Sequence, residues 1–132
     1  MMTVLFACVH NAGRSQMAAA FFNALADSRR AGAVSAGTEP ASRVQPEVVV
    51  AMREIGIDLE GAVPRRLTDE LAGSANILVT MGCGETCPVV PGAKRIEWDL
   101  QDPRGQDLDH VRRIRDVIKD HVVRLIQVEG WQ

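Results

Sequence analysis

The chain has 132 residues, with 15 Lys plus Arg against 17 Asp plus Glu, a formal net charge of −2 and 46% hydrophobic residues. This length is typical of one core that buries about two thirds of the unfolded surface, so we expect residues 1–132 to form a single domain. The near-neutral charge excludes a strongly basic nucleic-acid-binding protein. The even mixture of apolar and charged residues excludes a disordered chain.

The sequence predicts a cytoplasmic protein that has no membrane partner. No apolar run approaches the length of a membrane span, and the first residues lack the basic start and the long apolar segment of a signal peptide. Three cysteines, an odd number, make a poor disulfide framework. In a reducing compartment they are better interpreted as reactive groups.

The first half of the chain alternates strand and helix patterns. Residues 3–7 are a short unbroken apolar run, as expected for a buried parallel strand, and residues 8–14 form a loop of small residues. A helical pattern begins at Ser15. Residues 33–36 resemble a second strand, and residues 46–56 a helix with Pro at its first position and Gly at its end. The residues expected on the buried face of the first helix are Met17, Phe21, Ala24, Leu25 and Ser28.

The second half continues the alternation. Thr68 is a suitable N-cap for a short helix that ends near Gly73, and residues 76–80 are the clearest buried strand. A weaker strand is expected around residues 95–98. The last segment, from Leu108, has the apolar stripe of a long helix with charged residues between. On this last helix we expect Arg112, Arg113 and Arg115 to be exposed.

This alternation predicts an α/β fold with three layers, in which a four-stranded parallel sheet is flanked by helices on both faces. Ligands bind such sheets at the carboxyl ends of the strands. Cys8, Cys83 and Asp102 all follow predicted strands, so we expect them to lie on one rim.

Cys8 and Arg14 enclose five residues in a strand-to-helix loop, and Ser15 follows. Backbone N–H groups of such a loop can form a nest for an anion at the positive end of the helix. The Arg14 guanidinium adds a fork of donors that suits a tetrahedral oxyanion. The same donors favour a thiolate at Cys8, to which the Ser15 hydroxyl can donate. The expected substrate-binding residues are Val9, His10, Asn11, Ala12, Gly13 and Arg14.

The alternative for Cys8 is an ordinary buried core cysteine. Its neighbours Ala12, Gly13 and Arg14 are a poor core, and no other role explains the loop. We therefore predict a nucleophile directed at a bound oxyanion.

The segment Cys8-Val9-His10-Asn11-Ala12-Gly13-Arg14-Ser15 resembles the phosphate loop of low-molecular-weight protein tyrosine phosphatases and of the arsenate reductases that share their fold. Ser35-Ala36-Gly37-Thr38 resembles the family's second-strand signature. Asp102-Pro103 is similar to the loop that presents its general acid. From the residues alone, Asp-Pro is as typical of an ordinary turn. The resemblance implies that Asp102 protonates the leaving oxygen.

Cys83 and Cys87 lie in a glycine-containing loop. The presence of this pair of thiols distinguishes a predicted reductase from a predicted phosphatase. Reduction of arsenate takes two electrons, which two thiols supply by forming a disulfide. The segment is similar to the redox loop of three-cysteine, thioredoxin-coupled arsenate reductases. This similarity implies a relay from Cys8 through Cys83 to Cys87. The alternatives are half a zinc site, for which ligands are too few, and packed thiols.

Three departures from the family bear on the function. Only three residues separate Cys83 and Cys87, fewer than in the well-known members. Ala19 stands where potassium-binding members have an acidic residue, so no potassium site is expected. Arg104 follows Asp102-Pro103 where tyrosine phosphatases usually have an aromatic residue, which disfavours an aryl phosphate substrate.

We therefore predict an enzyme, a cytoplasmic arsenate reductase without cofactor or metal, whose catalytic residues are Cys8, Arg14, Ser15, Cys83, Cys87 and Asp102. Arsenate is the expected substrate, phosphate or sulfate a possible occupant of the loop, and thioredoxin the expected reductant. The alternatives are an arsenate–mycothiol transferase that uses an external thiol and a low-molecular-weight protein tyrosine phosphatase. An oxyanion-binding sensor is a further alternative, which the intact nucleophile disfavours.

Overall fold

The computed structural model describes residues 1–82 and 92–132, so the predicted redox residues Cys83 and Cys87 lie outside the described part. The elements in chain order are β1 (Met2–Cys8), α1 (Arg14–Leu25), β2 (Ala31–Gly37), α2 (Pro46–Arg53), α3 (Asp69–Gly73), β3 (Ile77–Thr80), β4 (Lys94–Glu97) and α4 (Leu108–Glu129). The strands form a four-stranded sheet in the order β2-β1-β3-β4, and every neighbouring pair is parallel. The predicted α/β fold with a four-stranded parallel sheet is confirmed.

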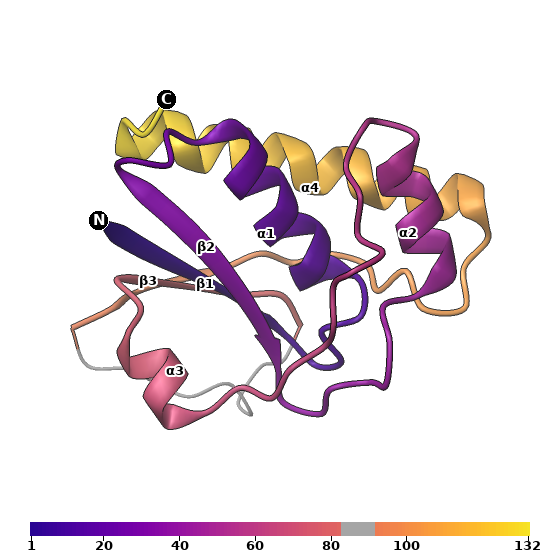
Figure 1. The fold of residues 1–132 in the computed structure, drawn as a ribbon, viewed down its shortest axis with the longest axis horizontal. Coiled ribbons are helices and arrows are strands. Elements are labelled where there is room, and N and C mark those ends of the chain that lie inside the picture. Colours follow the sequence, from indigo (N-terminus) through magenta and orange to yellow (C-terminus); the bar gives the residue numbers. More distant parts are fainter. Residues whose placement is uncertain (83–91) are drawn as a thin grey trace.

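The central strand β1 serves two cores because successive side chains of a strand point to opposite faces of the sheet. Val4 and Phe6 pack in the larger core, together with buried residues of α1, α2 and α4. Leu5 and Ala7 pack on the opposite face with Ala72 of α3. Figure 1 shows α1 and α4 together, apart from the short helix α3. The predicted three layers are present, with a thick helical layer on one face and α3 on the other.

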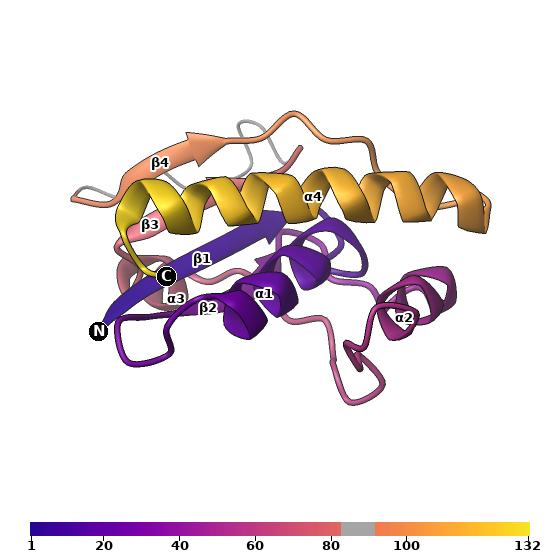
Figure 2. The same ribbon diagram turned by 90° about the horizontal axis from the view of Figure 1, so that it is seen from above.

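The longest helix, α4, spans the molecule from the region of the N-terminus to α2 (Figure 2). Its N-cap is Asp107, whose carboxylate accepts a hydrogen bond from the backbone N–H of His110 at 2.9 Å. Its buried stripe agrees with the sequence pattern and consists of Val111, Ile114, Ile118, Val122, Leu125 and Ile126. Among the helices of residues 1–82 and 92–132, none is both long enough and apolar enough to cross a membrane.

Two expectations for helix faces were wrong. In α1, Ala24 and Leu25 are exposed and Ser28 lies beyond the helix end. The first half of α1 is instead buried on nearly all sides, because it lies between the sheet and α4. Arg115 of α4 is also buried, at 8% exposure, and its guanidinium donates to the Ala51 carbonyl of α2 at 2.8 Å. The helical spacing of apolar residues could not reveal the burial of the first half of α1 or of Arg115, because both depend on contacts with segments that are distant in the sequence.

The sheet order places a topological switch between β1 and β3. After β1 the chain goes to β2 on one side, whereas β3 pairs on the other side of β1. Ala7 pairs with Thr80, and the backbone N–H of Met81 donates to the Ala7 carbonyl at 2.8 Å. The loops that follow these two strands therefore meet at the rim where ligands bind in such folds.

Candidate active site

The loop after β1 directs its carbonyl groups outward, toward residues 38–45. The carbonyls of Cys8, Val9 and His10 accept hydrogen bonds from backbone N–H groups of this segment at 2.8–3.2 Å. The Ala12 carbonyl accepts from the backbone N–H of Gln45 at 2.9 Å. Within the described residues, the N–H groups of Ala12 and Gly13 have no acceptor. These N–H groups are therefore available to a ligand, and the predicted role of the loop in binding an oxyanion stays a prediction.

The N-terminus of α1 adds to this field of donors. Within the described structure, no side chain caps α1, and its first turn contains no acidic residue. The first N–H groups of a helix have no intrahelical partner, and the helix dipole makes this end positive. An anion bound in the loop would accept hydrogen bonds from these N–H groups and would interact favourably with the positive end of the helix dipole. Phosphate-binding loops usually have this arrangement.

Cys8 is a free thiol, 2% exposed, at the last position of β1. Its Sγ lies 3.3 Å from the backbone nitrogen of Asn11, which donates to it, and 2.9 Å from Ser15 Oγ. Because Asn11 Nδ2 donates to Ser15 Oγ at 2.7 Å, the hydroxyl proton of Ser15 is available for the sulfur. Two donors directed at one sulfur distinguish Cys8 from an apolar core cysteine.

Asn11 holds the loop in shape. It is fully buried, and its φ of 50° lies in the left-handed region that Asn tolerates better than most residues. Its Oδ1 accepts from the backbone N–H of Arg65 at 3.0 Å and from Gln16 Nε2 at 3.1 Å. With its bond to Ser15, this one amide connects the loop, α1 and the segment before α3.

Arg14 lies at the first position of α1 and is 7% exposed. Its Nη1 donates to the Leu100 carbonyl at 3.2 Å, and its Nη2 lies 3.6 Å from Asp102 Oδ2. The Asp102 side chain is 40% exposed, so it faces both Arg14 and solvent. Cys8, Arg14 and Asp102 therefore lie at one rim. The sequence predicted one rim for Cys8, Cys83 and Asp102, and Cys83 lies outside the described residues.

Three glycines allow the segments around the loop to approach closely. A Cβ on Gly13 would lie 2.6 Å from Pro103 Cγ, and one on Gly37 would lie 2.9 Å from the backbone nitrogen of Asn11. A Cβ on Gly82 would overlap the guanidinium of Arg14, and Gly82 has a φ of 88°. Side chains are thus excluded where β2, the Asp102 segment and the end of β3 contact the loop.

Several residues of this rim were missed from the sequence. Gln16, Gly82 and the Leu100 carbonyl support the loop and Arg14, and Arg104 contacts His10. Leu100 and Arg104 are 86 and 94 residues away from their partners, so no local spacing could reveal them. Gln16 was detectable in part, because a polar residue directly after the phosphate loop faces a helix N-terminus. In the described residues, no three His, Cys, Asp or Glu side chains are grouped to hold a metal ion.

Comparison with known proteins identifies relatives along nearly the whole chain. A protein of Halobacterium salinarum is 40% identical over 124 residues, which cover 91% of this chain and 87% of its own. The glutaredoxin arsenate reductase of Synechocystis sp. is 35% identical over 129 residues, which cover 96% of this chain and 97% of its own. The solved thioredoxin-dependent arsenate reductase of Corynebacterium glutamicum superposes with a TM-score of 0.84 at 36% identity, and the match covers 98% of this chain but 63% of that one. Residues 3–129 match the low molecular weight phosphotyrosine protein phosphatase family, and the chain therefore belongs to this family.

Proposed function

We propose that this chain is an arsenate reductase, an enzyme that converts arsenate to arsenite through a covalent adduct on Cys8. The observation that carries the proposal is the sulfur of Cys8 in contact with two donors, at the base of a loop with N–H groups that have no acceptor among the described residues. Together with Arg14, these groups would form an oxyanion cradle. Relatives that cover nearly the whole chain are arsenate reductases. We further propose that residues 1–132 act as one domain, in the cytoplasm, where thiols stay reduced.

In the first step the sulfur of Cys8 attacks the arsenic of a bound arsenate. An arsenic–oxygen bond breaks, and the departing hydroxyl takes a proton from Asp102 and leaves as water. Arg14 and the loop N–H groups stabilise the charge on the remaining oxygens.

The second step uses the two thiols outside the described residues. The thiolate of Cys83 attacks the sulfur of Cys8, so that a disulfide forms and the sulfur–arsenic bond breaks. The electron pair of that bond stays on arsenic, which leaves as arsenite. Cys87 then attacks Cys83 and releases the Cys8 thiolate. Support comes from Gly82, which packs against the Arg14 guanidinium and is bonded directly to Cys83.

The resulting Cys83–Cys87 disulfide needs an external dithiol, and we propose thioredoxin. The solved relative from Corynebacterium glutamicum is thioredoxin-dependent, whereas the relative from Synechocystis is a glutaredoxin arsenate reductase. Three cysteines in one chain favour thioredoxin, since an internal disulfide is the product that a dithiol protein reduces. Phosphate or sulfate would occupy the same cradle as competing oxyanions.

The decisive experiment supplies reduced protein with arsenate and no added thiol. The relay predicts about one arsenite per chain and the loss of two thiols. Cys8→Ser and Cys83→Ser should form no arsenite. Cys87→Ser should form one arsenite and stop as a Cys8–Cys83 disulfide, which peptide mass mapping detects.

Two results would contradict the relay and separate the alternatives. No arsenite with three intact thiols, but turnover on addition of mycothiol and a glutaredoxin, would indicate an external-thiol transferase. Hydrolysis of a phosphate monoester that survives Cys83→Ser and Cys87→Ser would indicate a phosphatase. Arsenate binding without either reaction would indicate an oxyanion-binding sensor.

A further inference from the structure

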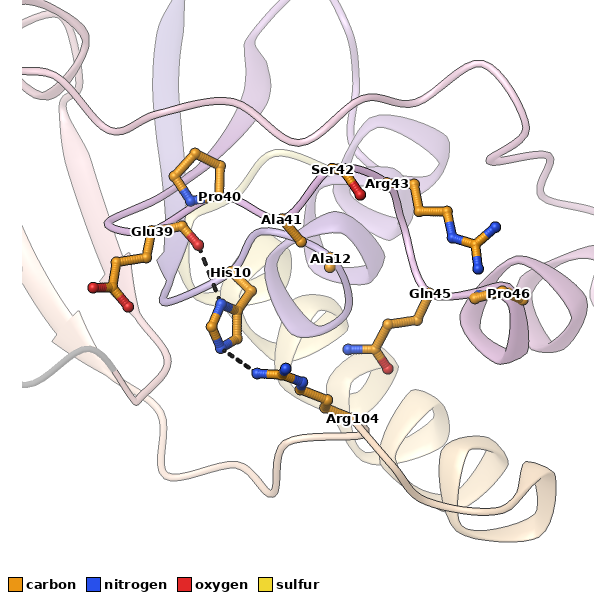
Figure 3. Close-up of a pocket in the computed structure, with 10 residues that line it drawn as sticks. All are labelled: His10, Ala12, Glu39, Pro40, Ala41, Ser42, Arg43, Gln45, Pro46 and Arg104. Carbon is orange, nitrogen blue, oxygen red and sulfur yellow. Dashed lines mark hydrogen bonds between the residues drawn. The ribbon is translucent and has the colours of Figure 1, made fainter.

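His10, in the middle of the phosphate loop, forms hydrogen bonds through both ring nitrogens. Nδ1 lies 3.1 Å from the carbonyl oxygen of Glu39, and Nε2 lies 3.0 Å from Nη1 of Arg104. Figure 3 shows the imidazole between these two partners. The three residues border a cavity of about 330 Å³ on the side of the loop that faces residues 39–46.

These two partners determine the protonation state of the imidazole. A carbonyl oxygen can only accept, so Nδ1 must be protonated and donate to Glu39. A guanidinium can only donate, so Nε2 must be unprotonated and accept from Arg104. His10 is therefore a neutral imidazole with its proton on Nδ1.

Arg104 connects this imidazole to the proposed general acid. Its backbone N–H donates to Asp102 Oδ1 at 2.9 Å, while its side chain contacts His10. Between them, Pro103 is buried and lies against Gly13 of the phosphate loop. The segment that contains Asp102 is thus attached to the loop at three points, namely His10, Gly13 and Arg14.

We propose that His10 and Arg104 form a latch that holds the Asp102 segment on the phosphate loop. His10 and Arg104 act here as positioning residues, through Asp102. The inference rests on the proposed role of Asp102 as the general acid, but the contact itself can be measured without any reaction.

Two substitutions of His10 separate the two bonds. The amide of Asn takes the place of Nδ1 and keeps the bond to Glu39, whereas the longer Gln reaches the place of Nε2 and offers its carbonyl oxygen to Arg104. We expect His10→Asn to lower kcat for arsenite formation about tenfold, the value of one hydrogen bond to a charged group, with little change in KM. His10→Gln should restore most of this loss. A role in loop packing alone would affect both variants alike.

Arg104→Met tests the other side of the latch and keeps most of the aliphatic length. It should lower kcat by a similar factor, and the double variant His10→Asn with Arg104→Met should be no slower than either single variant. Arg124→Gln removes a guanidinium from the exposed face of α4 and serves as the matched charge control. Additive losses in the double variant would overturn the latch.

Nitrogen NMR of the imidazole tests the latch without turnover. Wild-type His10 should show the Nδ1-protonated neutral tautomer, and Arg104→Met should give mixed tautomers. If the tautomer is as expected but no arsenite forms in any variant, the latch stands and the proposed reductase function fails. If arsenite forms normally while the ring is protonated on Nε2, the function stands and the latch is wrong.

Discussion

Asn11→Ala tests the structural basis of the oxyanion loop. The substitution removes an amide that is fully buried and that donates to Ser15, while its oxygen accepts from Gln16 and from the backbone of Arg65. It also places a side chain other than Asn or Gly at a φ of 50°. The lost hydrogen bonds and the backbone strain both raise the free energy of the folded protein, so we expect Asn11→Ala to lower its stability considerably.

The expected loss in free energy of unfolding is about 4 kcal/mol. Three hydrogen bonds whose partners stay behind, two of them buried and one partly buried, account for about 3 kcal/mol, at about 1 kcal/mol each. The left-handed backbone adds about 1 kcal/mol for Ala. Because the free energy of unfolding of a whole domain is about 5–15 kcal/mol, the Asn11 side chain is expected to contribute a considerable part of the stability of this protein.

Urea unfolding measures this loss, and Asn11→Gly is the matched control. With a slope of about 2 kcal/mol per molar urea, the midpoint of Asn11→Ala should fall by about 2 M. Glycine loses the same hydrogen bonds but accepts the positive φ, so its midpoint should lie about 0.5 M above that of Ala. Equal midpoints for Ala and Gly would refute the backbone argument. A loss below about 1 kcal/mol in both would refute the hydrogen-bond argument.

Three other changes give distinct outcomes. Gly82→Ala should lower kcat/KM for arsenate at least tenfold in steady-state assays, because its φ of 88° and the added Cβ displace Arg14. Asp102→Asn should lower kcat by a factor of about 10² to 10⁴ while calorimetry shows unchanged phosphate binding; an unchanged kcat would contradict its role as acid. The bond from Arg112 lowers the pKa of Glu54 from its ordinary 4.5, so this pair stabilises the fold above that pH and loses its effect as the pH falls through the lowered value. Thermal unfolding should therefore show Glu54→Gln to be less stable than wild type at neutral pH, with a difference that shrinks on acidification.

The sequence predicted those parts of the fold whose burial follows a local pattern. Residues 3–7 and 76–80 are continuous apolar runs, and they became the two central strands β1 and β3. The predicted strand, residues 33–36, was shorter than β2. Parallel pairing with β1 extends β2 to Ala31 and Gly37, whatever the local strand propensity of these residues. β4 gave a weak signal since it is an edge strand with mostly exposed side chains.

The site was predictable where its residues are adjacent in sequence. Cys8, Arg14 and Ser15 lie in one segment, so their spacing was enough to predict the cradle, and the roles assigned to them stay predictions. The bond from Arg14 to the Leu100 carbonyl and the contact of His10 with Arg104 join distant segments. These two contacts form only when the chain folds, so they could not be predicted from the sequence.

The position of β1 has a consequence for folding. It is the first strand of the chain and lies between β2 and β3 in the sheet, yet one of its faces is covered by α4, which begins at Leu108. Contacts between segments about a hundred residues apart must close a long loop before they stabilise anything, which slows folding. On a translating ribosome, the thiol at the end of β1 emerges early and stays outside a complete core until α4 has docked. Refolding without a reductant should consequently lose Cys8 to oxidation before the protein becomes native.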